Sequence, residues 1–296
     1  MRVLVTGGAG FIGSHLVDSL ISNNHSVIVI DNESASENEC FYWNDNAENY
    51  KYDICQYDKI ESLFKNIDCV FHLAAESRIQ TAIKNPAKTF KVNFMGTLNI
   101  LEASIKYGVD RVLYSSTSSY YGLKNDVPLI EDMDRDCLNP YSSSKVAGED
   151  LIRMYSKLYG IKSIIFRYFN VYGERQPTKG QYAPVVGLFQ KMKSEGKPMT
   201  VVGNGLARRD YTHVKDVVNA NILALTKKEM QNSTIINIGT GINYSVLELV
   251  DLIGGEYVHI PQRKGEAKET LADISAAKKY LNWEPKINLK DWLKNK

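Results

Sequence analysis

Cysteine, clustered histidine and long apolar runs are all scarce in this chain. Its 296 residues include only four cysteines, Cys40, Cys55, Cys69 and Cys137, and no C-x-x-C pair. This usage predicts reduced thiols in a cytoplasmic protein rather than a disulfide framework, although it leaves a single bridge open. The five histidines are widely spaced, so the sequence predicts no metal site.

The chain also lacks a run of eighteen apolar residues, and its first strand-like segment begins at Arg2. We therefore expect neither a membrane span nor a signal peptide, and no membrane partner. Positive and negative charges nearly balance, with 36 Lys and Arg against 34 Asp and Glu. A net charge of +2 gives no field that would favour nucleic acid as a partner.

Strand-like and helix-like segments alternate along most of the chain. The predicted strands are 3–5, 25–31, 51–54, 69–75, 111–116, 163–169, 199–202, 234–238 and 257–260. The predicted helices are 11–20, 58–66, 86–107, 141–159, 182–195, 216–227, 245–253 and 275–281. This alternation predicts the α/β class, a doubly wound parallel sheet of the Rossmann type with a smaller C-terminal α/β lobe.

The opening segment joins a strand-like run, a group of glycines and a helix-like segment. Gly8, Gly10 and Gly13 satisfy G-x-G-x-x-G, and Gly7, Gly10 and Gly13 give a second pattern at a spacing of three. Glycines allow a tight turn and a close approach of the backbone to a pyrophosphate, whose charge the helix N-terminus attracts. The order of strand, turn and helix favours a dinucleotide site over a purely structural turn.

Asp31 ends the second predicted strand, eighteen residues beyond Gly13. A carboxylate at this place accepts both hydroxyls of an adenosine ribose and repels a 2′-phosphate. We therefore predict NAD rather than NADP as the cofactor. The alternative is that Asp31 is only a turn residue at the end of a strand.

Tyr141 and Lys145 lie four residues apart in a predicted helix and so share one of its faces. A nearby ammonium and a positive nicotinamide ring favour the phenolate, which then takes a hydroxyl proton while a hydride leaves. Upstream, a hydroxyl-rich turn follows the strand at 111–116, where Thr117 can hold the same substrate oxygen. The alternatives are a Tyr–Lys pair on a surface helix and a solvated serine turn.

The chain resembles the extended short-chain dehydrogenase/reductases, in particular the NAD-dependent nucleotide-sugar epimerase/dehydratase branch that includes UDP-glucose 4-epimerase. The resemblance runs nearly end to end. It rests on VTGGAGFIG at 5–13, Asp31, Asp53-Ile54, HLAA at 72–75, Asn93, SST at 115–117, Tyr141 with Lys145, RYFNVYG at 167–173, RRDYTHV at 208–214 and PQRKGE at 261–266.

The resemblance implies roles for individual residues. The catalytic residues would be Tyr141, Lys145 and Thr117. NAD would contact Gly7, Gly10, Phe11, Ile12, Gly13, Asp31, Asn32, Asp53, Ile54, Leu73, Ala74, Ala75, Asn93, Ser115, Tyr141, Lys145 and Tyr168. A nucleotide sugar, UDP-linked in the family's manner, would contact Thr117, Asn170, Gln181, Tyr182, Val201, Arg209, Arg263 and Glu266.

The two arginines would pair with the diphosphate, which needs cations in a partly buried site. For Arg209 the alternative is a surface charge beside Arg208, with the register displaced by one residue. The resemblance also implies an NAD-binding domain at 1–169, to which 211–238 return, and a nucleotide-sugar-binding lobe at 170–210 and 239–296. It further implies a homodimer formed through the helices at 86–107 and 141–159, and a C-terminal lobe shorter than is usual in the family.

Residues after the catalytic threonine distinguish reactions within this family. Dehydratases carry an Asp-Glu pair there, and decarboxylases tend to carry a glutamate at the position of Ser119. Here Ser118 and Ser119 follow Thr117, so the resemblance favours 4-epimerisation of a UDP-hexose or UDP-N-acetylhexosamine through a transient 4-keto sugar. The alternatives are a dehydratase, decarboxylase or reductase of the same fold, or a non-catalytic NAD-binding regulatory module.

Overall fold

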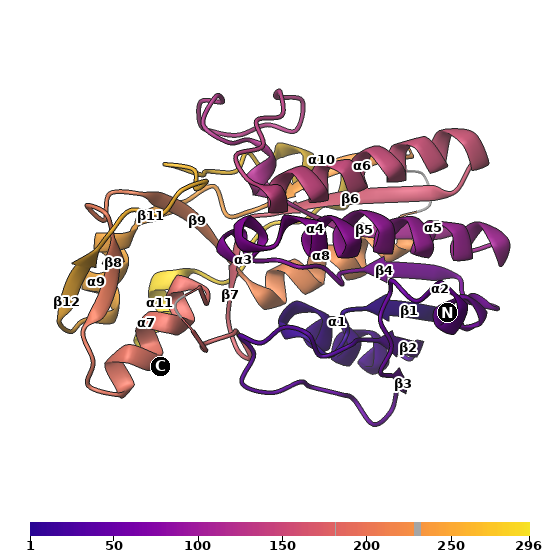
Figure 1. Ribbon diagram of the computed structural model, residues 1–296, viewed down its shortest axis with the longest axis horizontal. Helices are drawn as coiled ribbons and strands as arrows, with labels where there is room; N and C mark the ends of the chain where they lie inside the picture. Colours follow the sequence, from indigo (N-terminus) through magenta and orange to yellow (C-terminus); the bar gives the residue numbers. More distant parts are fainter. Residues whose placement is uncertain (181, 228–231) are drawn as a thin grey trace.

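A computed structural model describes residues 1–180, 182–227 and 232–296 of the chain (Figure 1). In these ranges the largest sheet has seven strands, all parallel. In spatial order they are β10 (Thr234–Ile238), β6 (Lys162–Tyr168), β5 (Arg111–Thr117), β4 (Cys69–His72), β1 (Arg2–Thr6), β2 (Ser26–Ile30) and β3 (Glu48–Tyr50). The strand order reverses between β1 and β4, and ligands of doubly wound sheets bind in the crevice at such a point. The predicted fold class is confirmed.

Helices cover both faces of this sheet. One core contains residues of α1 (Phe11–Ser22), α8 (Val214–Thr226) and α10 (Ser275–Leu281). The other contains residues of α2 (Tyr57–Ile60), α5 (Thr97–Lys106) and α6 (Pro140–Tyr159), and α4 (Pro86–Phe90) leads into α5 through a π-helical turn. Figure 1 shows α1 and α5 on opposite sides of the sheet.

Alternation along β1 explains why both faces are covered. Val3 and Val5 belong to the first core and Leu4 to the second, and all three are fully buried. Successive side chains of a strand point to opposite faces, so an unbroken apolar run requires packing on both. The short runs that were read as buried strands in the sequence therefore form the middle of the sheet.

A smaller lobe lies beside one end of the central sheet (Figure 1). It contains a three-stranded sheet of β11 (Asn243–Ser245), β9 (Arg208–His213) and β7 (Asn170–Tyr172), and a pair of β12 (Tyr257–Ile260) and β8 (Met199–Val202). Its helices are α7 (Val185–Ser194), α9 (Val246–Ile253) and α11 (Leu289–Lys294). The predicted boundary between residues 210 and 211 falls inside β9, while α8 and β10 belong to the large sheet; the domain division itself stays a prediction.

Several predicted elements differ from the structure. The third strand is β3 rather than residues 51–54, and the helix predicted from residue 182 begins at Val185, after Pro184. The strands β7 and β11 and the helices α3 (Ile79–Lys84) and α11 were not predicted, because elements this short show too few repeats of a pattern. The longer strand β9 was also missed, because its sequence, RRDYTH, contains no apolar run. No helix in the described ranges has the length and apolar character needed to cross a membrane.

Candidate active site

A cavity of about 830 Å³ opens where the carboxyl ends of β1, β4 and β5 meet the smaller lobe. This volume lies in the range of about 300–1,000 Å³ that is usual for ligand sites. Most of the residues predicted for binding or catalysis line it together. These are Gly7, Gly10, Phe11, Ile12, Gly13, Asp31, Asn32, Ile54, Leu73, Ala74, Ala75, Ser115, Thr117, Tyr141, Lys145, Tyr168, Asn170, Tyr182, Arg209, Arg263 and Glu266.

Three other predicted residues, Asp53, Val201 and Asn93, are not among the residues that line the cavity. The Asp53 carboxylate accepts hydrogen bonds from the Asn32 amide at 3.2 Å and from the Cys55 backbone at 2.8 Å. Val201 is fully buried in the core of the smaller lobe. Gln181, also predicted for the substrate, lies outside the described residues.

Asn93, the third predicted residue that does not line the cavity, supports the loop that follows β4. Its side chain accepts from the Glu76 backbone N–H at 2.8 Å, and donates to the Glu76 carbonyl at 3.0 Å and to Ser144 Oγ at 2.9 Å. Asn93 is buried within the π-helical turn between α4 and α5, and Ser144 belongs to α6. Asn93 thus joins the end of β4 to the helix that carries Tyr141.

The glycine turn has different requirements at each of its glycines. A Cβ on Gly13 would lie 2.1 Å from the carbonyl oxygen of Gly7, and Gly7 itself has φ of +71°. A Cβ on Gly10 would instead meet no protein atom closer than 3.4 Å. Gly7 and Gly13 therefore allow the chain to turn, whereas Gly10 leaves room in the cavity.

The same turn presents the start of α1 to the cavity. Gly10 is the N-cap residue of α1, and no side chain caps this end of the helix. Backbone N–H groups and the positive end of the helix dipole meet the cavity beside Phe11 and Ile12. This cradle fits a pyrophosphate.

Asp31 is held in a fixed orientation at the end of β2. Its carboxylate accepts from the backbone N–H of Ala9 at 3.1 Å and of Glu33 at 2.8 Å. Burial raises the pKa of this carboxyl above its ordinary value, and those two hydrogen bonds oppose the rise. Its remaining acceptor capacity suits the hydroxyls of a ribose, so the glycine turn and Asp31 together fit NAD.

Tyr141 lies in the first turn of α6, whose start is well defined by the sequence. Asn139 and Ser142 form a capping box, and Pro140 occupies the first helical position. Tyr141 and Thr117 both line the cavity, and the Thr117 hydroxyl acts to lower the pKa of Tyr141, which indicates that the two side chains lie close together. Thr117 Oγ1 accepts from the Ser119 N–H at 3.1 Å. Two distant hydroxyls are thereby placed at one point of the cavity wall.

Lys145 is 2% exposed, and its ammonium nitrogen lies 4.2 Å from the centre of the Tyr114 ring. Burial lowers its pKa to about 7, although the neighbouring Glu149 carboxylate acts to raise it. Burial also raises the pKa of Tyr141, while the hydrogen bond from Thr117 and the charge of Arg78 act to lower it. Burial thus acts against both charges, and the prediction that Lys145 together with the nicotinamide favours the Tyr141 phenolate concerns the NAD-bound site and stays a prediction.

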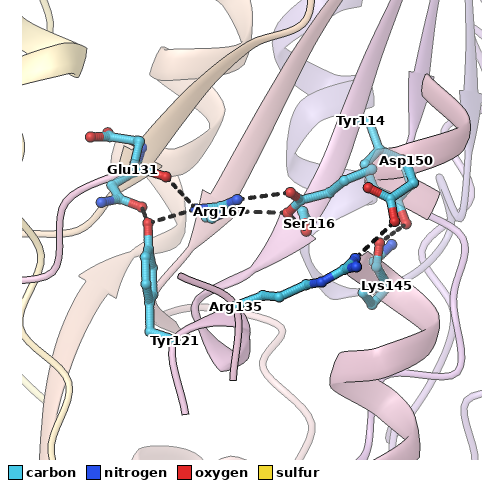
Figure 2. Close-up of polar contacts among 10 residues, drawn as sticks. Tyr114, Ser116, Tyr121, Glu131, Arg135, Lys145, Asp150 and Arg167 are labelled. Carbon is cyan, nitrogen blue, oxygen red and sulfur yellow. Dashed lines mark hydrogen bonds and ion pairs between the residues drawn. The ribbon is translucent and has the colours of Figure 1, made fainter. Parts of the chain in front are cut away.

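A buried ion pair that was not predicted holds α6 against the sheet (Figure 2). The Arg167 guanidinium donates to the two oxygens of Glu149 at 3.1 and 2.9 Å, and Ser116 Oγ donates to Glu149 at 2.5 Å. Arg167 also donates to the Tyr121 hydroxyl at 3.1 Å. Glu149 lies one turn after Lys145, so this pair helps to set the position of the catalytic helix.

The cations predicted for a diphosphate lie at the other end of the cavity. The Arg209 guanidinium donates to the carbonyls of Arg208, Ala267 and Lys268 at 2.9, 2.7 and 3.2 Å. The carboxylate of Glu266 lies 3.9 Å from Arg209 and 4.0 Å from Arg263.

The register of the Arg208–Arg209 pair is settled by where the two side chains go. Arg208 lies 3.0 Å from Glu248 and donates to Asn243 at 2.8 Å, away from the cavity wall. Arg209 lines the cavity with a side chain that is only 15% exposed. The alternative of a surface charge at Arg209 is therefore wrong.

Several polar residues line the cavity without having been predicted, among them Arg78, Gln80 and Lys268. Gln80 donates to the Lys264 carbonyl at 3.0 Å, which joins the start of α3 to the segment around Arg263. The available signal was the polar stretch directly after HLAA, but its spacing carries no recognisable motif.

Comparison with known proteins agrees with this site. The model of the NAD dependent epimerase/dehydratase family matches residues 3–239. The chain belongs to this family. Its cofactor is accordingly NAD, which the glycine turn and Asp31 fit.

Relatives in this family match over nearly the whole chain. A putative UDP-glucose 4-epimerase of Methanocaldococcus jannaschii is 40% identical over 99% of this chain and 98% of its own length. A UDP-glucuronate 4-epimerase of Thermodesulfobacterium geofontis is 34% identical over 98% of this chain and 93% of its own length. The crystal structure of UDP-glucose 4-epimerase with UDP-glucose from Thermotoga maritima superposes with a TM-score of 0.93. It is 40% identical, and the match covers 99% of this chain and 96% of that one. Against these relatives the prediction of a shortened C-terminal lobe is wrong.

Proposed function

We propose that the chain is an NAD-dependent 4-epimerase of a nucleotide sugar, a UDP-hexose or UDP-N-acetylhexosamine, which acts through a transient 4-keto sugar. The observation that carries this proposal is that Tyr141 and Thr117 line the same cavity close to each other. It presents a base and a hydroxyl to one substrate oxygen.

The carboxylates in the cavity support epimerisation over elimination or decarboxylation. Among the described residues that line it, the acids are Asp31 and Glu266. Asp31 ends β2 beside the glycine turn, and Glu266 lies near two arginines. Next to Thr117 the cavity wall carries Ser118 and Ser119, which supply no acid for the loss of water.

In the proposed reaction Tyr141 takes the proton of the C4 hydroxyl, and Thr117 holds the same oxygen by a hydrogen bond. NAD supplies a reversible acceptor for the hydride from C4. Arg209 and Arg263 bind the diphosphate, so the nucleotide stays fixed while the 4-keto sugar turns about its linkage. Return of the hydride to the other face of C4, with the proton from Tyr141, gives the epimer.

The remaining predicted contacts follow from this arrangement. We propose that Tyr168 and Ser115 lie beside the nicotinamide, since they are hydrogen-bonded to each other at 3.1 Å in the cavity wall. Asn170 and Tyr182 would contact the nucleotide sugar. The relatives named above support a UDP-linked substrate.

A homodimer is also proposed, through the helices α4 to α6. Phe90, Met95, Met154 and Leu158 on these helices are 39%, 46%, 43% and 65% exposed. Large apolar side chains exposed on neighbouring helices favour burial in an interface. Light scattering of the purified protein would give its mass, and a monomer at micromolar concentration would contradict this assembly.

The decisive experiment mixes the purified protein with UDP-N-acetylglucosamine, UDP-glucose or UDP-glucuronate, each alone and without added cofactor. NMR then follows the sugar signals. Appearance of the galacto-configured product shows 4-epimerisation and a retained NAD together. The control is Tyr141→Phe, which keeps the ring but removes the base and should lower the rate by about 10²–10⁴-fold.

Other outcomes of the same experiment would overturn the proposal. A 4-keto-6-deoxy product indicates a dehydratase, and loss of carbon dioxide from UDP-glucuronate indicates a decarboxylase. Turnover that requires added NADH indicates a reductase. Unchanged sugars in every mixture, with NAD present, favour a non-catalytic NAD-binding module.

A further inference from the structure

His72 is a buried histidine at the end of β4 to which the proposed reaction gives no role. It is 1% exposed, and both of its ring nitrogens are hydrogen-bonded. Nδ1 lies 2.7 Å from Thr6 Oγ1 at the end of β1, and Nε2 lies 2.9 Å from Thr97 Oγ1 at the start of α5. The ring therefore joins the strand before the glycine turn to the helix that follows the π-helical turn.

The hydrogen bonds of the neighbouring groups determine which nitrogen of His72 carries the proton. Thr97 Oγ1 donates its one hydrogen to the Asn93 carbonyl at 2.6 Å, so it can only accept from His72. Nε2 must then be the protonated nitrogen, and Nδ1 accepts from Thr6 Oγ1. Burial and the charge of Lys145 hold the pKa of His72 well below its ordinary value, which keeps the ring neutral.

At one end these hydrogen bonds reach the glycine turn. The Ala74 backbone N–H donates to Thr6 Oγ1 at 3.2 Å, and Thr6 directly precedes Gly7. The backbone of Ala74 lies against the turn, because a Cβ on Gly7 would be only 2.8 Å from the Ala74 nitrogen. The hydroxyl of Thr6 thus ties the segment after β4 to the place that fits a pyrophosphate.

At the other end the hydrogen bonds reach the backbone of Tyr141. Asn93 Nδ2 donates to Ser144 Oγ at 2.9 Å, and Ser144 Oγ donates to the Tyr141 carbonyl at 2.8 Å. The amide of Asn93 cannot be reversed, because its Oδ1 accepts from the Glu76 backbone N–H at 2.8 Å. The direction of each hydrogen bond from the glycine turn to α6 is therefore fixed.

The side chains that make these contacts form one buried network, which we call the His72 network. Its members are each at most 1% exposed: Thr6, His72, Asn93, Thr97 and Ser144. Buried polar groups cost free energy unless they are hydrogen-bonded, so apolar residues would be the simpler way to fill this space. A fully satisfied polar network instead specifies one relative position of the segments that it joins. Those segments carry Gly7, Ala74 and Tyr141, which all line the cavity.

We propose that His72 is a positioning residue that holds the glycine turn and the helix of Tyr141 in one fixed relation through the His72 network. This rests on the proposed function for the role of Tyr141. Cofactor bound at the glycine turn and the base at the other end of the network are then aligned by the same hydrogen bonds. Loss of one hydroxyl in the middle of the network should be felt at both ends.

The test removes the hydroxyl that accepts from His72 and measures the effect at each end. Thr97→Val removes this acceptor with little change in volume. Ser104→Ala is the matched control, because Ser104 is also buried on α5 and donates to the Ile100 carbonyl at 2.6 Å, outside the His72 network. Thr97→Ser keeps the hydroxyl and should behave as the wild type.

At the Tyr141 end, NMR follows the backbone carbonyls of tyrosines labelled with ¹³C. The signal missing from Tyr141→Phe identifies this residue among the 18 tyrosines. Thr97→Val should move the Tyr141 signal upfield, because a weaker hydrogen bond to a carbonyl shields its carbon. Ser104→Ala should leave the signal in place.

At the glycine end, titration calorimetry of the nucleotide-free protein measures the affinity for NAD. Thr97→Val should lower this affinity about tenfold, and Ser104→Ala should not. If the protein epimerises, Thr97→Val should also lower kcat at saturating NAD by about 10–100-fold, with KM for the nucleotide sugar unchanged. The carbonyl and affinity measurements need no turnover, so they still decide the question if epimerisation fails.

The tautomer of His72 is a separate check. In ¹⁵N spectra of the histidine rings, the signals missing from His72→Gln should have the pattern of an Nε2–H imidazole. An Nδ1–H pattern would reverse the direction of the hydrogen bonds and overturn the inference.

Two further results would overturn it. One is a Thr97→Val protein with a lower melting temperature but an unchanged Tyr141 carbonyl signal and NAD affinity, and the other is an equal effect of Thr97→Val and Ser104→Ala. If Thr97→Val does not fold, Ser144→Ala breaks the network at its other end. The ring signals of His72 should then move in Ser144→Ala and stay constant in Ser143→Ala, a change at the neighbouring half-buried serine of α6. Constant His72 signals in both variants would contradict the proposal.

Discussion

Arg167 and Glu149 form a two-point ion pair whose side chains are 0% and 2% exposed, with Arg167 Nη2 2.9 Å from Glu149 Oε2. The pair joins β6 to the helix that carries Tyr141 and Lys145. In Figure 2, Arg167 lies between Tyr121 and the carboxylate beside Ser116. Because this ion pair is almost completely buried, it fixes the position of α6 against the sheet.

Glu149→Gln should destabilise the protein by about 3–5 kcal/mol, because it leaves the buried Arg167 charge without compensation. The matched control is Asp150→Asn on the next residue of α6. Asp150 pairs with Arg135 at 3.0 Å, but these side chains are 58% and 62% exposed, so its loss should cost no more than about 1 kcal/mol. Urea denaturation of both variants measures the difference. Equal effects would show that the buried pair is not an anchor.

Gly13→Ala should reduce both NAD retention and stability, because its Cβ would lie 2.1 Å from the Gly7 carbonyl oxygen. In an unconstrained helix the same change stabilises by roughly 1 kcal/mol. Gly10→Ala should preserve the melting temperature, since its Cβ would lie 3.4 Å from the nearest atom beyond its chain neighbours, the Gly7 carbonyl oxygen. The same substitution should lower the NAD content. Melting curves and chromatography of the released nucleotide separate the two effects. Full NAD content in Gly10→Ala would place the pyrophosphate elsewhere.

Asp31→Ala should lower NAD affinity about tenfold or more and narrow the preference over NADP, because the acceptor for the ribose hydroxyls is lost. Asp53→Asn provides the comparison, since Asp53 is hydrogen-bonded to Asn32 and is not among the residues that line the cavity. We expect its effect on NAD affinity to be the smaller of the two. Titration calorimetry of nucleotide-free protein measures both, and an equal loss would assign Asp53 a direct contact.

The buried Lys145 should make stability depend on pH. Its pKa is about 7 in the folded protein and near the ordinary 10.5 in the unfolded chain. Between these values the unfolded chain binds more protons, so the contribution of Lys145 to stability rises with pH. Relative to Lys145→Met, the nucleotide-free wild type should therefore gain stability from pH 7 toward pH 10. Urea denaturation of both proteins across this range measures how the free energy of unfolding changes with pH. A stability difference that stays constant with pH would place the Lys145 ammonium in contact with water.

The sequence by itself determined those features that depend on neighbouring residues in the chain, namely turns, helix starts and buried strands. The glycines at 7 and 13 are required by a turn in which backbone atoms touch, so their spacing alone predicts the turn. The capping residues Asn139 and Pro140 likewise mark the start of α6, and unbroken apolar runs mark strands that are buried on both faces. The placement of Tyr141 and Lys145 on one helix could also be predicted from their spacing, while their catalytic roles stay a prediction.

Tertiary structure alone decided which charges meet. Arg167 and Glu149 lie on different elements, and no pattern in the sequence indicates that each neutralises the other. The directions of the Arg208 and Arg209 side chains were set by their alternation along β9, and the Asp53 carboxylate accepts a hydrogen bond from the Asn32 amide. The ionisation of Tyr141 and Lys145 depends on burial and on neighbouring charges, because desolvation and long-range charge are properties of the folded surroundings rather than of the spacing of residues.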